Sequence, residues 1–166
     1  MALMKRIFNI ISTVIVLLGL STACSKEPAA VTLDASLVGE WHKVEVLYDG
    51  EEVEIPVDVY LVLNENCTFV LYQKFLGTTS TDQEAQDRYT RFTGTCKFEN
   101  NVLSGVYSSG REWNESYYAE IVGEMLQLTT SDYLEVQTYR KEALSAVEKA
   151  NAAISTKANT EISPVL

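Results

Sequence analysis

The chain has 166 residues and a formal net charge of −10. Hydrophobic residues make up 46% of it and charged residues 22%, a composition typical of one folded globular domain rather than of a disordered chain. An acidic chain lacks the basic surface that nucleic-acid binding needs, so we expect no nucleic-acid partner. One histidine and three cysteines leave few ligands for a transition metal, and we expect neither a metal site nor a cofactor.

The first 23 residues predict a secretory signal peptide. Two basic residues precede an apolar run over 7–20, which is too short to cross a hydrocarbon core of about 30 Å as a helix. Small residues then lead to Cys24. This ending resembles a bacterial lipobox, although Ser21 stands where leucine is usual, and the resemblance implies cleavage before Cys24 and lipidation of that cysteine. The alternative is an ordinary signal peptide followed by an unrelated cysteine.

Lipid chains on Cys24 would hold the mature protein on a membrane. The acidic chain repels anionic headgroups, so we expect a tethered protein rather than one that lies on the lipid surface. Residues 24–36 are then the lipidated cysteine and its tether. The expected location is the cell envelope, as an outer-membrane lipoprotein on either its periplasmic or its surface face.

Between Leu37 and Arg140 short β-type runs alternate with turn residues, and no helical period interrupts them. Asp49-Gly50 is the clearest hairpin signal. The pattern predicts eight strands, at Val38–Tyr48, Val57–Leu63, Cys67–Phe75, Arg88–Phe98, Val102–Tyr107, Glu115–Val122, Met125–Thr130 and Leu134–Arg140.

Eight strands in sequence order, joined by short loops, predict an all-β antiparallel up-and-down barrel over residues 37–140. Closure removes the exposed edges of such a sheet, and eight strands enclose just enough room for side chains or one small ligand. A two-sheet sandwich is the alternative. In a closed barrel the first and last strands pair, which brings Arg140 beside Trp41, where an arginine over the indole makes a cation–π contact.

The run Gly39-Glu40-Trp41 matches the G-x-W signature with which lipocalins begin their first strand. Arg140 stands where lipocalins place the arginine that packs on that tryptophan. The segments YLVLNENCTFVLYQ and FTGTCKFENNVLSGVY are similar to the lipocalin-like domains of small Gram-negative envelope lipoproteins. The resemblance covers about 37–142 and implies an eight-stranded barrel in an envelope lipoprotein, without a defined ligand.

Strict alternation along the first strand sends Lys43 and Glu45 to the inside together with Trp41, which is costly for charged groups. A β-bulge between Trp41 and Val44 would avoid this arrangement.

Inward positions carry Gln73, Phe75, Trp113 and Tyr117 toward the end of the barrel where the longer loops gather. Ligand pockets are mostly apolar and aromatic with a few polar groups, so these four are the candidate ligand-binding residues. The alternative is that they only fill the barrel.

Cys67 and Cys96 are placed almost symmetrically about one hairpin, and a disulfide between them is chemically allowed outside the cytoplasm. Two reduced, buried thiols are the alternative. Residues 141–158 are rich in helix formers and predict a C-terminal helix, and 159–166 are expected to be a disordered tail.

The leading hypothesis is an envelope lipoprotein whose barrel binds a small hydrophobic or amphipathic ligand without covalent chemistry. The competing hypothesis is a filled barrel that docks an envelope partner, or inhibits a foreign enzyme, through its loops. His42 is the only imidazole and is expected to be structural, and no nucleophile–base arrangement can be read, so we expect no enzyme.

Overall fold

The computed structural model describes residues 32–76, 88–155 and 164–166. All of them belong to one compact unit, Val31–Leu166. The predicted signal peptide and the predicted lipidation site at Cys24 lie outside the described residues.

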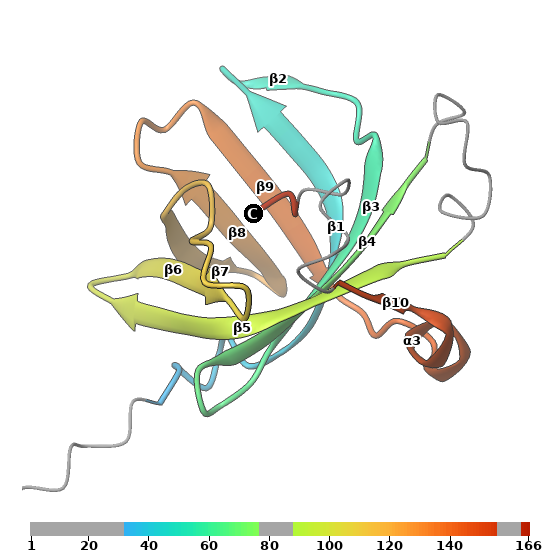
Figure 1. Ribbon diagram of the computed structural model, residues 1–166. Helices are drawn as coiled ribbons and strands as arrows, with labels where there is room; N and C mark the ends of the chain where they lie inside the picture. The colour runs from blue at the N-terminus through green and yellow to red at the C-terminus, as the bar shows by residue number, and fades with distance from the viewer. Residues whose placement is uncertain (1–31, 77–87, 156–163) are drawn as a thin grey trace, which may run out of the picture. The chain divides into compact units, whose positions relative to one another are not determined.

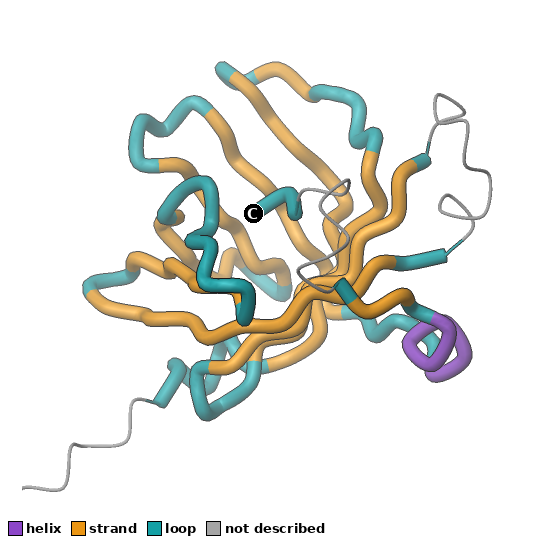
Figure 2. Tube along the Cα trace, viewed as in Figure 1, coloured by secondary structure: helices purple, strands orange, loops and turns teal. Residues whose placement is uncertain are grey.

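Eight strands form a closed antiparallel barrel, in which each strand pairs with the next one in the sequence (Figures 1 and 2). The last long strand pairs with the first from Trp41↔Lys141 to Tyr48↔Glu135, so the barrel hypothesis is confirmed and the sandwich is wrong. The strands are β1 (Gly39–Tyr48), β3 (Val57–Leu63), β4 (Thr68–Phe75), β5 (Thr90–Glu99), β6 (Val102–Tyr107), β7 (Tyr117–Val122), β8 (Met125–Thr130) and β9 (Glu135–Lys141).

Turn residues with positive φ fix the register of these hairpins. Asp49 and Gly50 have φ values of 51° and 80°, and β2 (Glu51–Glu52) folds back on the end of β1 directly after them. Asn100 and Asn101 have φ values of 52° and 64° between the paired residues Glu99 and Val102. Asparagine and glycine adopt this backbone region at little cost, which is why these dipeptides predicted the turns.

The bulge in β1 lies later than the sequence pattern suggested. The pairing with β9 shifts between Lys43 and Glu45, so Val44 is the extra residue. Lys43 therefore does face the interior, where it is only 9% exposed. Glu45 turns to the outer face instead, where its carboxylate accepts a hydrogen bond of 3.1 Å from the Thr138 hydroxyl.

The residue packed on Trp41 is Lys141, not Arg140. Trp41 pairs with Lys141 across the β1–β9 seam, and the Lys141 ammonium lies 5.4 Å from the centre of an indole that is 2% exposed. Arg140 pairs with His42 on the opposite face and binds the carboxylate of Glu142. The predicted meeting of the two strand ends is confirmed, but its register was wrong by one residue.

The expected tether over 24–36 extends too far along the chain. Leu33 is 4% exposed, and its N–H donates to the Glu65 carbonyl at 2.9 Å. Leu37 is 2% exposed, and its carbonyl accepts the Trp41 indole N–H at 2.9 Å. Both leucines belong to the main core cluster, so the barrel unit already includes residue 33.

The C-terminal helix is much shorter than the predicted 141–158. Lys141 belongs to β9, and α3 (Ala146–Asn151) has six residues, capped by the Ser145 hydroxyl, which accepts from the Glu148 N–H. Two residues later β10 (Ala153–Ile154) pairs in parallel with β5. The helix lies outside the ring of strands (Figure 2).

Residues 159–166 were expected to be a disordered tail, but 164–166 are ordered in the structure. Leu166 is 0% exposed, and Val165 packs against the same core cluster. Residues 156–163 lie outside the described part of the chain.

Gly94 allows β5 and β6 to approach closely, and a side chain there should be damaging. A Cβ would stand 2.2 Å from the backbone oxygen of Val106 and 2.6 Å from the Phe69 ring. We expect Gly94→Ala to lower the free energy of unfolding by about 3 kcal/mol, the upper range for overpacking. Chemical denaturation measures it, with exposed Thr95→Ala as the control. Equal unfolding midpoints for the two variants would contradict the close approach.

Candidate functional site

The open end of the barrel is defined here as the end that carries the loops after β1, β4, β6 and β8. The opposite, closed end carries the turns after β3, β5 and β7 and is packed by Leu33, Leu37 and Trp41. The residues that could meet a ligand therefore lie in the interior half nearer the open end.

Three of the four predicted ligand-binding residues lie in that half. Gln73 of β4 is 1% exposed, Tyr117 of β7 is 3% exposed, and Trp113 in the loop before β7 is 6% exposed. Phe75 shares the face of Gln73 but lies at the end of β4, where it is 43% exposed. Gln73, Trp113 and Tyr117 are therefore buried in the open half of the interior, and Phe75 lies at its rim. We call this half, which side chains fill, the chamber.

The indole of Trp113 lies across Gly105 of β6. A Cβ at Gly105 would stand 2.3 Å from the ring, so the absent side chain makes the room. The indole meets Phe69 edge to face at 5.1 Å between ring centres and Tyr117 at 6.3 Å. Its backbone N–H donates to the Gly105 carbonyl, but its indole N–H is buried and has no partner among the described residues.

A polar line on β9 also faces this chamber, and sequence reasoning missed it. The Tyr139 hydroxyl donates to Gln137 Oε1 at 2.6 Å, and the Gln137 amide donates to Glu135 Oε1 at 2.5 Å. The Lys43 ammonium lies 5.7 Å from the centre of the Tyr139 ring. Burial lowers the pKa of Lys43 to about 8, with Glu135 acting in the opposite direction.

The register error at Trp41 explains the miss. Placing Arg140 beside Trp41 puts Val136 and Thr138 on the inner face of the last strand. The observed pairing with Lys141 puts Glu135, Gln137 and Tyr139 there instead. In the sequence, the alternate positions Glu135, Gln137 and Tyr139 carry two polar residues and one aromatic residue, and this pattern could have indicated a polar inner face on β9.

The chain's own residues 164–166 lie in the same chamber. The Val165 N–H donates to Gln73 Oε1 at 3.1 Å, and the Tyr107 hydroxyl donates to the Leu166 carbonyl at 3.1 Å. Burial raises the pKa of Tyr107 and, together with Glu135, that of Tyr117, so both hydroxyls stay protonated and can donate at neutral pH. Figure 1 marks this end of the chain within the ring of strands.

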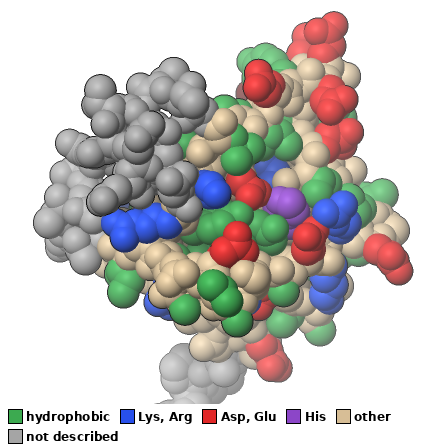
Figure 3. Space-filling model, turned by 90° about the vertical axis from the view of Figure 1, so that its right-hand side faces the viewer, with side chains coloured by type: hydrophobic (Ala, Val, Ile, Leu, Met, Phe, Trp, Pro, Cys, Tyr) green, Lys and Arg blue, Asp and Glu red, His purple; other side chains and the backbone are tan. Residues whose placement is uncertain are grey.

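A second polar cluster lies on the outer wall under α3. His42 faces two carboxylates, with Nε2 at 2.8 Å from Asp58 and Nδ1 at 3.2 Å from Glu142, and its ring stacks on Tyr60 at 4.2 Å. The Tyr89 hydroxyl donates to Asp58 at 2.5 Å. Figure 3 shows the histidine on this face among charged side chains.

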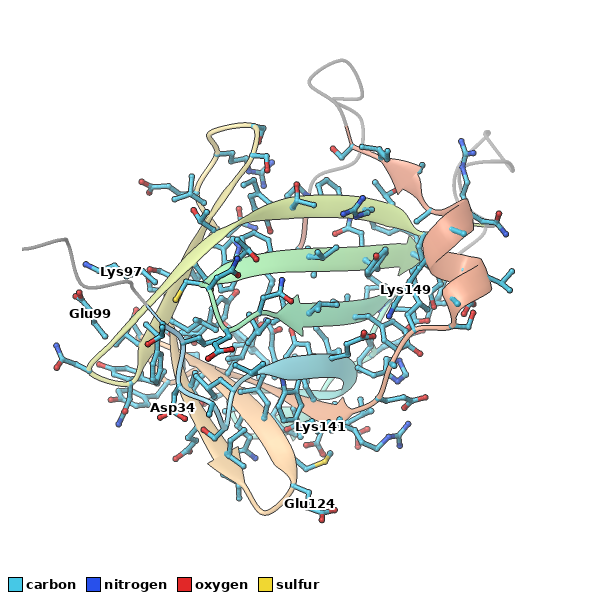
Figure 4. The ribbon with its side chains drawn as sticks, turned by 90° about the horizontal axis from the view of Figure 1, so that it is seen from below. Asp34, Lys97, Glu99, Glu124, Lys141 and Lys149 are labelled. Atoms are coloured by element: carbon cyan, nitrogen blue, oxygen red, sulfur yellow. The ribbon has the colours of Figure 1, made fainter. Side chains whose placement is uncertain are left out.

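This outer cluster attaches the segment after β9 to the wall. Beside it Lys149 of α3, labelled in Figure 4, binds both carboxylate oxygens of Glu40 at 2.6 and 2.7 Å. Leu144 is buried against tyrosines of β3 and β4. Tyr89 bonds to Asp58 and not to His42, so the described residues of the cluster do not form a hydroxyl–imidazole pair for nucleophilic catalysis.

An open hollow of about 440 Å³ lies over β4, β5 and β6 on the outside of the barrel. Its lining contains one charged residue, Arg91, and otherwise threonine, serine, valine and glycine with Phe69 and Tyr107. The interior chamber brings together more polar groups and is the better candidate site.

Within the described ranges no group of three or more His, Cys, Asp or Glu residues is placed to hold a metal ion. In the same ranges no helix is long and apolar enough to cross a membrane.

Comparisons with known proteins find likenesses in solved structures alone: no protein-family model and no curated protein matches the sequence. A lipoprotein YedD from Klebsiella pneumoniae is 13% identical, with a TM-score of 0.44 over 74% of this chain and 86% of that one. A fatty acid transporter, REP1-NXSQ, is 13% identical, with a TM-score of 0.36 over 68% and 100%. Fatty-acid-binding protein 1 of Echinococcus granulosus is 14% identical, with a TM-score of 0.33 over 65% and 98%. The eight-stranded antiparallel barrel follows from the strand pairing itself, and we take no function from these likenesses.

The lowered pKa of Lys43 predicts how the free energy of unfolding depends on pH. Below pH 8 Lys43 is protonated in both the folded and the unfolded protein, and its burial cost of about 3 kcal/mol is fully present. Between about pH 8 and 10.5 the folded protein releases this proton first, so the free energy of unfolding rises with pH. We expect Lys43→Met to be more stable than the wild type at pH 7, by an amount that shrinks toward pH 10.

Denaturant unfolding at several pH values measures this difference, with exposed Lys97→Met as the control for a lost surface charge. A difference between Lys43→Met and the wild type that is the same at pH 7 and pH 9.5 would contradict the buried position of Lys43.

Cys67 and Cys96 are both buried free thiols in the structure, and the Cys96 N–H donates to the Cys67 carbonyl at 2.7 Å. Their disulfide stays a prediction. Burial and the neighbouring Cys67 raise the pKa of Cys96 to about 12. We therefore expect Cys96 in the reduced, folded protein to react with a maleimide on the order of 1,000-fold more slowly than after unfolding, since the thiolate is the nucleophile. Time-resolved peptide mass spectrometry of the reduced wild-type protein measures the rate at Cys96, and equal rates in the folded and unfolded protein would contradict the prediction.

Proposed function

We propose that this protein is a lipid-anchored protein of the bacterial cell envelope whose barrel binds a small hydrophobic or amphipathic molecule without covalent chemistry. The anchor is Cys24, on the evidence of the lipobox-like ending alone. The ligand lies in the interior half nearer the open end, between Gln73, Trp113 and Tyr117.

The observation that carries this proposal is the buried indole N–H of Trp113, which finds no hydrogen-bond partner among the residues that the structure describes. An unsatisfied buried donor costs on the order of 1–3 kcal/mol, so proteins rarely keep one without a use. Around it the chamber offers the rings of Phe69, Tyr107 and Tyr117, and the amide of Gln73. Aromatic walls with a few polar groups are the usual make-up of a small-molecule site.

The charged groups of the chamber favour an amphipathic ligand over a purely apolar one. Lys43 lies deep on β1, and Glu135 lies at the outer end of the polar line on β9. A ligand whose apolar body contacts the aromatic rings can place one acceptor near Trp113 and still leave the Gln137–Tyr139 hydrogen bond intact. Binding then needs burial and two or three polar contacts, and no reaction step.

Native mass spectrometry of Ser25–Leu166, purified from its own host's envelope, tests the proposal directly. We expect a discrete extra mass that is lost on denaturation. A bare mass under repeated gentle conditions would count against a tightly bound ligand.

The second test uses 1-anilinonaphthalene-8-sulfonate as an amphipathic fluorescent probe. Trp113→Phe keeps an aromatic ring but removes the N–H donor, so we expect it to weaken probe binding about 2- to 10-fold, the value of one hydrogen bond. Trp41→Phe is the matched control, since its indole N–H is bonded to Leu37 at the closed end. Equal losses in the two variants would show that the effect is not local to the chamber.

A second candidate function, a module that docks a protein partner, is favoured by apolar side chains around the open end. Six such side chains are 39–67% exposed, and all belong to the ends of β1 and β4 or to the loops after β1, β4 and β8. They are Tyr48, Val53, Phe75, Leu76, Tyr133 and Leu134. Exposed apolar groups gathered at one end are typical of an interaction surface.

A further inference from the structure

The chamber at the open end is already occupied, and residues 164–166 of this chain occupy it. Pro164 and Leu166 are buried, and Leu166 is 0% exposed in a cluster with the inward side chains of the barrel. Figure 1 places this end of the chain inside the ring of strands. No β-strand pairing joins these residues to the wall, so they are not part of the sheet.

The wall contacts this segment through its main chain. The side-chain amide of Gln73 accepts the N–H of Val165 at 3.1 Å, and the Tyr107 hydroxyl donates to the carbonyl of Leu166 at 3.1 Å. One hydrogen bond comes from β4 and the other from β6, so they fall on two different parts of the wall. Between them the leucine side chain is buried among apolar groups.

This arrangement recognises a peptide. A fatty acid could offer an oxygen to Tyr107, but it has no N–H at the position that Gln73 accepts, whereas an apolar peptide in the same conformation has both groups. Proline has no N–H to satisfy, which suits a buried position before the bonded Val165. A buried leucine flanked by two main-chain hydrogen bonds is the pattern by which proteins hold short apolar peptides.

We propose that the open half of the interior is a binding site for a short apolar peptide segment, and that residues 164–166 occupy it as an intramolecular ligand. The inference names the ligand class of the site proposed above and so rests on that function. It adds that an external ligand binds by displacing residues 164–166. The apparent affinity for any such ligand is then reduced by the fraction of molecules in which the segment is bound.

The test measures binding of an N-acetylated peptide, Ile-Ser-Pro-Val-Leu, which has the sequence of residues 162–166, by isothermal titration calorimetry. The proteins are Ser25–Leu166 and a variant that lacks Pro164–Leu166. We expect the peptide to bind the shortened variant at least tenfold more tightly than the intact protein, because the intact protein must first release its own segment.

A matched peptide with N-methylvaline lacks the N–H that Gln73 accepts. We expect it to bind the shortened variant about 2- to 10-fold more weakly, the value of one hydrogen bond. The Tyr107→Phe change in the shortened variant removes the other hydrogen bond and should have a similar effect. Unchanged affinity in both comparisons would overturn recognition through the main chain.

A full-length pair keeps the test valid if the shortened variant does not fold. Val165→Pro removes the N–H that bonds to Gln73, and Val165→Ala keeps it. We expect Val165→Pro to bind the peptide more tightly than Val165→Ala does. Equal peptide affinities for these two variants would overturn the self-occupied site.

The outcomes separate this proposal from the proposed function. If 1-anilinonaphthalene-8-sulfonate binds the chamber as judged by the Trp113→Phe and Trp41→Phe pair, but the peptide binds neither protein, peptide recognition is wrong and the amphipathic-ligand function stands. If neither probe binds any of the variants, both proposals are wrong. Equal peptide affinity for the intact and shortened proteins contradicts self-occupancy.

Discussion

The width of an eight-stranded barrel is the constraint on which the rest of this structure depends. The pairing of β9 with β1 closes the sheet, and the enclosed space must be filled by something. The wall itself is adapted to this need. Gly94 and Gly105 have no side chains, so the ring of Phe69 occupies the space of a Cβ at Gly94 and the ring of Trp113 occupies the space of a Cβ at Gly105. Large rings from the wall and loops thus fill a cylinder that aliphatic side chains alone would fill less completely.

Filling is achieved differently in the two halves of the barrel. At the closed end Leu33 and Leu37 pack in one cluster with Trp41, and the Lys141 ammonium lies over the indole face. At the open end the filling is polar, with Lys43 beside Tyr139 and the hydrogen-bonded pair Gln137–Glu135. Buried charged and polar groups are often less stabilising than apolar residues of the same size. A barrel selected for stability alone would not need them, which supports the binding role proposed for the open half.

The strands were predictable because their signals are local. Asp49-Gly50 and Asn100-Asn101 mark hairpins whatever the rest of the chain does, and closure follows from eight strands in sequence order. The site was less predictable because it depends on register. The predicted register was wrong by one residue at Trp41, so Arg140 was expected beside Trp41 in place of Lys141, and Gln137 was missed.

The prediction for the C-terminal region was wrong for a related reason. Helix formers after residue 141 predicted a long helix, yet only Ala146–Asn151 is helical, because the segment is held by Leu144 and by the pairing of β10 with β5. Propensity is a weak guide when tertiary contacts decide. The burial of Leu166 has no local signal at all, since it depends on space created by residues about 60 to 90 positions earlier.

The free energy that holds residues 164–166 explains how a barrel with a filled interior could also bind a ligand. Burying one leucine contributes about 1.5–3 kcal/mol, and two neutral hydrogen bonds contribute about 0.5–1.5 kcal/mol each. Ordering three residues costs about 1–2 kcal/mol each, which offsets most of this gain. The segment is therefore bound but weakly held, unlike Leu61 or Leu71, which pair with a neighbouring strand on both sides. In the proposed site, residues 164–166 keep the open half of the interior packed when no ligand is bound. A ligand can displace them because they are weakly held. A packed interior is therefore what the proposed binding site predicts for the unbound protein.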